Sequence, residues 1–296
     1  MSMTGWLLLL LLPFANLSAP EEASSSPDIR PEVSMKVLSC TEVVGPDTWL
    51  VLACTFNIPD KWHIYWKNPG ISGVPTEIRV EGPDGFVIKP VVYPRPQVIP
   101  DSGGITYGYE KEVTLLVPIH PPATWPDQPE VEFKVSADWL VCRGACFFGE
   151  AETTIRIPWL VPAEQGAEPP PLKPWATTLL AEAYWPRPLK RRPETTAKIV
   201  DSRLIIEGRV SQVGKAGFLP DPTPGVTFGE PVHTINDGRF VLSVPFRVRL
   251  ADTLGQPPLA RGLLTFGDKA TMPVFDVSVP INVSSTNDSS VINEKE

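Results

Sequence analysis

Two cysteines that lie four positions apart, Cys142 and Cys146, are the residues best suited to chemistry. Hydrophobic and polar residues alternate through residues 131–141, before the pair, and again through residues 151–157, after it. Alternation with a period of two is typical of half-buried β-strands, so we predict one hairpin centred on Gly144. In this hairpin the two cysteines stand opposite each other on the polar face.

Opposed residues in an antiparallel pair have Cβ atoms about 4.5–5.5 Å apart, slightly beyond the spacing of about 3.5–4.5 Å in an unstrained disulfide. We therefore expect Cys142 and Cys146 to form a disulfide under some strain. Strained or exposed disulfides are the labile and catalytic ones, which makes redox exchange one hypothesis. A static disulfide that closes the hairpin tip is the alternative, and the C-x-x-x-C spacing alone leaves both open.

A soft metal site is a third hypothesis, because two thiolates can bind Cu(I). The chain has three histidines, His63, His120 and His233, and none has ligand spacing to the cysteines. His63 lies in an aromatic segment, where a packed residue is commoner than a ligand. The motifs of serine hydrolases, zinc proteases and phosphate-binding loops are absent from the sequence. We predict no metal and no organic cofactor.

The other two cysteines, Cys40 and Cys54, flank a turn signal at Pro46 and Asp47. A hairpin centred near Asp47 places these cysteines opposite each other, so we predict a structural disulfide between them. In the chain-entropy model such a loop closure stabilises the fold by roughly 3 kcal/mol.

The chain as a whole is acidic and rich in proline. Its 296 residues have a formal net charge of −8, which argues against nucleic acid and anionic membrane surfaces as partners. Residues 1–19 contain an apolar run that is too short to span a bilayer and suits a secretory signal peptide. We predict an exported protein without a membrane span in the mature chain, a disordered leader at 20–31 and a disordered tail at 284–296.

Two β domains are predicted between these ends. The 36 prolines, and short strands separated by turns, favour an all-β protein. Residues 32–160 form the first domain, with the pattern of a β-sandwich. Residues 161–195 form a Pro-rich linker with at most one short helix at 176–184, and residues 196–283 form a second, smaller β domain.

Three blocks of sequence follow one another in the first domain. They are Trp62-His63-Ile64-Tyr65-Trp66-Lys67-Asn68-Pro69-Gly70 with Ser72-Gly73-Val74-Pro75-Thr76, then Tyr107-Gly108-Tyr109-Glu110, then Trp139-Leu140-Val141-Cys142 with Cys146. Together the blocks resemble the N-terminal periplasmic domain of the DsbD/ScsB family of thiol:disulfide interchange proteins. The second domain is similar, more weakly, to the β region that follows in ScsB-like members.

The resemblance implies an immunoglobulin-like β-sandwich in the periplasm. Its cysteine pair would receive electrons from a thioredoxin-like domain or a DsbD/ScsB-type membrane reductase and pass them to oxidised periplasmic proteins. The resemblance further implies that Cys146 forms the mixed disulfides and that Cys142 resolves them.

The resemblance also implies which aromatic residues surround the pair. A capping loop maps to residues 103–109 and contains Tyr107 and Tyr109, while Trp62 and Tyr65 are candidate walls of the site. Trp139 belongs to the same surround through the third block.

Family members continue into a membrane domain and a thioredoxin-like domain, for which this sequence has no counterpart. We therefore expect either that its electron donor is another protein or that the chain is a lone acceptor, a chaperone-like binder or a decoy of the pathway. We therefore predict a thiol:disulfide exchange module, a component of protein-disulfide reduction, that uses Cys142 and Cys146. The alternatives are a non-catalytic interaction module with two structural disulfides and a Cu(I)-handling protein that uses the same cysteines.

Overall fold

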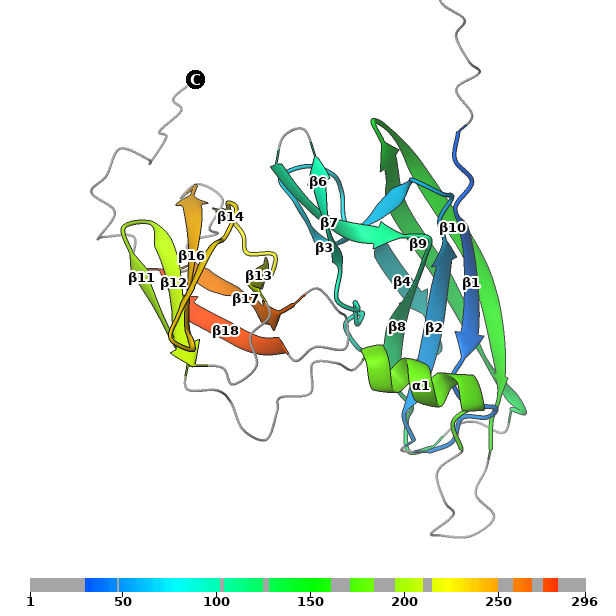
Figure 1. Ribbon diagram of the computed structural model, residues 1–296. Coiled ribbons are helices and arrows are strands. Elements are labelled where there is room, and N and C mark those ends of the chain that lie inside the picture. The colour runs from blue at the N-terminus through cyan, green and yellow to red at the C-terminus, as the bar shows by residue number, and fades with distance from the viewer. Residues whose placement is uncertain are drawn as a thin grey trace, which may run out of the picture. The chain divides into compact units, whose positions relative to one another are not determined.

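The computed structural model describes residues 30–46, 48–101, 104–124, 128–160, 171–183, 195–209, 215–249, 258–267 and 274–281. Strands make up most of these residues, and α1 (Pro174–Ala183) is the one α-helix among them (Figure 1). The all-β prediction is therefore confirmed. The predicted signal peptide at 1–19 and tail at 284–296 lie outside the described residues.

Two antiparallel sheets form the first domain (Figure 1). One sheet has the order β1-β2-β8-β5 and consists of β1 (Ser34–Ser39), β2 (Leu50–Asn57), β8 (Glu112–His120) and β5 (Val87–Ile88). The other has the order β10-β9-β3-β7-β6, with β4 also paired to β9; its strands are β10 (Ala145–Pro158), β9 (Glu130–Arg143), β3 (His63–Gly70), β7 (Gly104–Glu110), β6 (Gln97–Asp101) and β4 (Glu77–Glu81). Because the two sheets enclose one hydrophobic core, the domain is the predicted immunoglobulin-like β-sandwich.

The inner faces of the two sheets supply this core. Along β9, alternate residues such as Phe133, Val135 and Trp139 are buried, while the polar residues between them face outward. Across the sandwich, the rings of Phe56 and Trp139 meet edge to face with centroids 5.4 Å apart. The period-two pattern of the sequence thus fixes which face of β9 is buried.

The hairpin of β9 and β10 is the longest pairing of the sandwich. Its register runs without interruption from Ala145 opposite Arg143 to Pro158 opposite Glu130. Gly144 makes the turn with φ of 76°, a left-handed conformation that glycine adopts without steric cost. The predicted hairpin centred on Gly144 is confirmed.

The predicted disulfide between Cys40 and Cys54 is wrong, because the register of β1 and β2 differs from the expected one. Cys54 stands opposite Val37, and the amide of Cys40 donates a hydrogen bond to the carbonyl of Val51 at 2.9 Å. The two strands are thus shifted from the predicted pairing by three residues, and an odd shift moves a side chain to the other face. Both cysteines are buried free thiols.

The helix α1 packs on the outer face of the first sheet rather than lying in an unattached linker (Figure 1). Ala176 is fully buried in a cluster that contains Cys40, Val51 and Leu116. The amide of Lys173, just before the helix, donates a hydrogen bond to the carbonyl of Cys40 at 2.8 Å. Cys40 therefore lies between the sheet and the helix, whereas Cys54 faces the sandwich core.

A second set of strands forms a separate core without cysteine. One sheet has the order β11-β12-β16-β14, with β15 paired to β16; its strands are β11 (Thr195–Val200), β12 (Arg203–Arg209), β16 (Arg239–Val248), β14 (Val226–Phe228) and β15 (Val232–Asn236). The other has the order β13-β17-β18, with β13 (Ala216–Pro220), β17 (Leu259–Phe266) and β18 (Val274–Pro280). This arrangement is the second, smaller β domain of the prediction.

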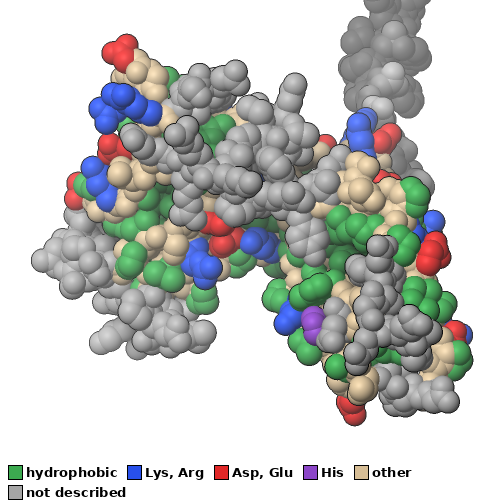
Figure 2. Space-filling view, turned by 90° about the horizontal axis from the view of Figure 1, so that it is seen from below, with side chains coloured by type: hydrophobic (Ala, Val, Ile, Leu, Met, Phe, Trp, Pro, Cys, Tyr) green, Lys and Arg blue, Asp and Glu red, His purple; other side chains and the backbone are tan. Residues whose placement is uncertain are grey.

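Charges of both signs lie close together among the described residues on one face of the molecule. On the face that Figure 2 shows, Lys and Arg side chains lie beside Asp and Glu in small groups among hydrophobic ones. None of the helical segments in the described part of the chain has the length and apolar character to cross a membrane.

The packing of α1 can be tested by placing a charge at its buried position. We expect Ala176→Glu to lower the free energy of unfolding by about 2–4 kcal/mol, because the carboxylate must be desolvated or the helix must detach. Detachment uncovers Cys40, so its alkylation in the native protein should accelerate. Thr177→Glu, at the adjacent exposed position, is the control. Equal effects of the two substitutions in urea unfolding and thiol labelling would show that α1 does not cover the sheet.

Candidate functional site

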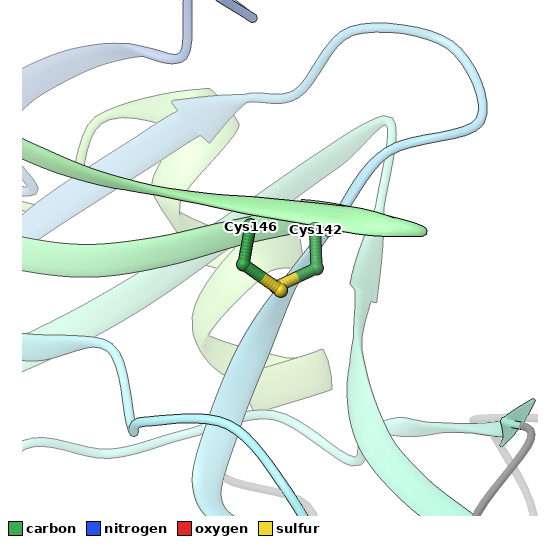
Figure 3. Close-up of a disulfide and its surroundings, with 2 residues drawn as sticks. All are labelled: Cys142 and Cys146. Atoms are coloured by element: carbon green, nitrogen blue, oxygen red, sulfur yellow. A yellow bond between two sulfur atoms is a disulfide. The ribbon is translucent and has the colours of Figure 1, made fainter.

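Cys142 and Cys146 form a disulfide across the tip of the β9–β10 hairpin. The two sulfur atoms are 2.03 Å apart and the two Cα atoms 4.2 Å apart. Figure 3 shows both side chains projecting from the same side of the hairpin. That side is the outer face of the sheet, because the neighbouring residues Val141 and Trp139 point into the sandwich core.

The two sulfurs differ in their exposure. Cys142 is 3% exposed, because β9 lies inside the sheet and its outer face is covered there by Tyr65 and Leu140. Cys146 is exposed, because β10 is the edge strand of the sheet. An incoming thiolate can therefore attack the sulfur of Cys146. In that reaction the sulfur of Cys142 is the leaving group.

Tyr65 is the predicted wall residue that the structure places beside the disulfide. It is 2% exposed and shares a small cluster with Leu140 and Cys142. The loop after β3 lies on its ring, since a Cβ atom on Gly73 would come within 2.3 Å of the Tyr65 Cε1 atom. The segment that covers this part of the site is therefore the β3–β4 connection.

Of the expected cap at residues 103–109, residue 103 lies outside the described residues, and residues 104–109 do not lie over the disulfide. Tyr107 and Tyr109 belong to β7 and point into the core. The ring of Tyr107 packs against Trp66 with centroids 6.1 Å apart, and the Tyr109 hydroxyl donates a hydrogen bond to the carbonyl of Pro94 at 2.7 Å. The reason is again the two-residue period, because Gly108 between the tyrosines occupies the outer face opposite Tyr65.

Trp62 and Trp139 support the hairpin from its inner side. The ring of Trp62 packs against Phe147 with centroids 5.9 Å apart, and the guanidinium carbon of Arg143 lies 5.0 Å from the Trp62 ring centroid. The indole of Trp139 lies on the backbone of Gly149, where a Cβ atom would come within 2.3 Å of its Nε1 atom. These contacts hold the tip in place without touching the outer face.

The structure adds two residues to the site: His63, which the sequence analysis weighed as a metal ligand and interpreted as packed, and Glu110, to which it gave no role. His63 stands directly opposite Cys142 on the adjacent strand, and Glu110 stands directly opposite His63 on the strand beyond. Strand neighbours far apart in sequence cannot be inferred from periodicity, so His63 was interpreted as a packed residue.

The other two cysteines, Cys40 and Cys54, are free thiols with low reactivity. Burial raises the pKa of Cys40 to about 11 and that of Cys54 to about 12. Since the thiolate is the nucleophile, both groups are unreactive near neutral pH. Across the described ranges, His, Cys, Asp and Glu side chains form no group of three or more that could hold a metal ion.

Comparisons with known proteins agree with this geometry. Residues 28–157 match the family model described as thiol:disulfide interchange protein DsbD, N-terminal. The crystal structure of the N-terminal periplasmic domain of ScsB from Proteus mirabilis is similar with a TM-score of 0.60 and 16% identity, over 87% of this chain and 96% of that one. At this identity the likeness shows a shared fold.

A second solved structure, the chaperone DraB of E. coli, gives a TM-score of 0.26 and 10% identity over 83% of this chain and 98% of that one. This likeness is too low to support an argument. No curated protein sequence matches the chain.

The difference between the two cysteine pairs can be measured by counting thiols. In the native oxidised protein at pH 8 we expect no rapid alkylation, because one pair is bonded and the other stays protonated. After mild reduction, Cys146 should label first, while Cys40 and Cys54 should label only in denaturant. Mass spectrometry of the alkylated peptides makes the measurement. A peptide that joins Cys40 to Cys54 in the unreduced protein would contradict the observed register.

Proposed function

Because residues 28–157 belong to the family of DsbD N-terminal domains, we propose that this protein is a thiol:disulfide exchange module. It passes electrons from a thioredoxin-like donor to oxidised partner proteins through Cys142 and Cys146. The observation that supports this role most directly is the unequal exposure of the two sulfurs, with Cys146 open to solvent and Cys142 buried behind it.

Each exchange transfers two electrons through a mixed disulfide. A donor thiolate attacks Cys146, the bond between the two cysteines breaks, and its electron pair goes to Cys142. The second donor thiol then attacks the donor sulfur of the mixed disulfide, which releases the module with two thiols and the donor with a disulfide. In the second half, Cys146 attacks the acceptor disulfide, and Cys142 displaces the acceptor as its own disulfide forms again.

The surroundings of Cys146 are suited to docking a protein. Phe148, two residues further along β10, is 67% exposed on the same face. An exposed apolar side chain beside a reactive sulfur offers a partner surface area to bury during exchange. The donor we propose is a thioredoxin-like domain or a DsbD/ScsB-type membrane reductase, and the compartment is the periplasm.

The assignment of roles can be tested by trapping the mixed disulfide. We expect Cys142→Ser to accumulate a stable adduct with a thioredoxin-like partner whose second cysteine is replaced by serine and whose remaining cysteine carries a nitrothiobenzoate leaving group, because neither protein then has a sulfur that resolves the adduct. Cys146→Ser is the matched variant and should form at least tenfold less adduct, because Cys142 is buried. Non-reducing electrophoresis with mass spectrometry identifies the adduct.

The reduction potential of each pair separates this role from its alternatives. A value for Cys142–Cys146 between about −120 and −270 mV by glutathione titration supports exchange. A value below roughly −300 mV identifies a structural disulfide and overturns the proposal. Tight binding of Cu(I) by the reduced protein, abolished in Cys142→Ser, together with no exchange, favours copper handling instead.

A further inference from the structure

Four residues form a row across the outer face of the second sheet. Glu110 on β7 stands opposite His63 on β3, His63 stands opposite Cys142 on β9, and Cys142 stands opposite Cys146 on β10. Directly opposed residues of antiparallel strands share a face and have Cβ atoms about 4.5–5.5 Å apart. A carboxylate, an imidazole and the two sulfurs are thus neighbours in that order.

The middle of this row is shielded from water. Cys142 is 3% exposed, and both His63 and Glu110 are partly buried. The ring of His63 meets Tyr65 edge to face with centroids 5.1 Å apart, and Tyr65 is itself packed on Cys142. The imidazole is therefore held on the face where the Cys142 sulfur is released during exchange.

Other charged groups flank the row without standing directly opposite His63. They are Lys61, Lys111, Asp138, Arg143 and Glu150. Arg143 lies over the Trp62 ring, Asp138 is paired with Arg79, and Lys61 and Lys111 are exposed at turns. Tyr65, whose ring meets that of His63, is a further titratable group among the described residues. Glu110 is therefore the charged group that the register sets against His63.

A buried cysteine ionises with difficulty, because desolvation disfavours the thiolate. Cys142 must nevertheless become a thiolate in order to resolve the mixed disulfide. A neighbouring base that takes the proton and remains beside the sulfur as a cation removes this obstacle, as in other pairs of thiol and histidine.

We propose that His63 accepts the proton of the Cys142 thiol and that Glu110 positions the imidazole for this transfer. The proposal rests on the exchange function of the same cysteines. In resolution, the proton moves from Cys142 to His63, the thiolate attacks Cys146, and the partner leaves with the electron pair of the broken bond. In the opposite direction, Cys142 leaves as a thiolate and His63 returns the proton to it.

The resolving step can be isolated with a chromogenic disulfide, 5,5′-dithiobis(2-nitrobenzoate). The fully reduced protein reacts with it at Cys146 and releases one coloured thiolate, and attack by Cys142 on the adduct then releases a second. Burial raises the pKa of Cys40 to about 11 and of Cys54 to about 12, so these thiols contribute nothing near neutral pH. The rate of the second release against pH reports on the ionisation of Cys142.

We expect His63→Gln to slow the second release at least about tenfold at pH 7, because burial keeps the Cys142 thiol protonated when no neighbouring base takes its proton. The defect should become smaller as the pH rises from 7 toward 9.5, because a growing fraction of the Cys142 thiol then ionises without a base. Glu110→Gln should show a smaller defect with the same dependence on pH. His120→Gln, on the other sheet beside Trp49, should behave as the wild type.

A merely structural role predicts a different profile, since a misplaced hairpin slows the release equally at every pH. A pH-independent defect, or no defect, in both His63→Gln and Glu110→Gln overturns the proposal, and circular dichroism verifies that each variant is folded. Failure of the wild type to release the second thiolate would instead overturn the exchange function itself. The two failures are therefore distinguishable.

Discussion

The antiparallel register of β9 and β10 is the constraint on which the site depends. It brings Cys142 opposite Cys146 and at the same time turns Trp139 and Val141 into the core. A slip of one residue would move every side chain of a strand to the other face, so the register is fixed by the cost of exposing the core residues. The long hydrophobic alternation, rather than the disulfide, determines where the two sulfurs lie.

Strand order then gives the two cysteines their different environments. The second sheet ends at β10, so Cys146 has no neighbouring strand on one side, whereas β9 lies between β10 and β3. The outer face of β9 is covered by Tyr65, which is in turn covered by the loop that contains Gly73. An accessible sulfur and a protected one therefore follow from position in the sheet.

The sequence predicted the features that depend on neighbouring residues along the chain. The prediction of the β9–β10 hairpin was correct, because two long alternating stretches meet at Gly144. Only one register of these stretches buries the apolar residues of both strands. The predicted disulfide between Cys40 and Cys54 was wrong because the register of β1 and β2 is centred between Gly45 and Pro46 rather than at Asp47, so that Val37 stands opposite Cys54. The predicted cap is not formed by residues 104–109 because these residues belong to β7, in which Tyr107 and Tyr109 share the buried face.

The row of Glu110, His63 and Cys142 could not be predicted from one sequence, because it depends on which strands are neighbours in the sheet. Its members are separated by long stretches of chain and become neighbours only because β3 inserts between β7 and β9. The pair Cys40 and Cys54 shows the converse, since two cysteines close in sequence lie on opposite faces and stay inert. Reactivity in this domain thus depends on the face that a sulfur occupies, which the register sets, and on whether its strand is at the edge of the sheet, which strand order sets.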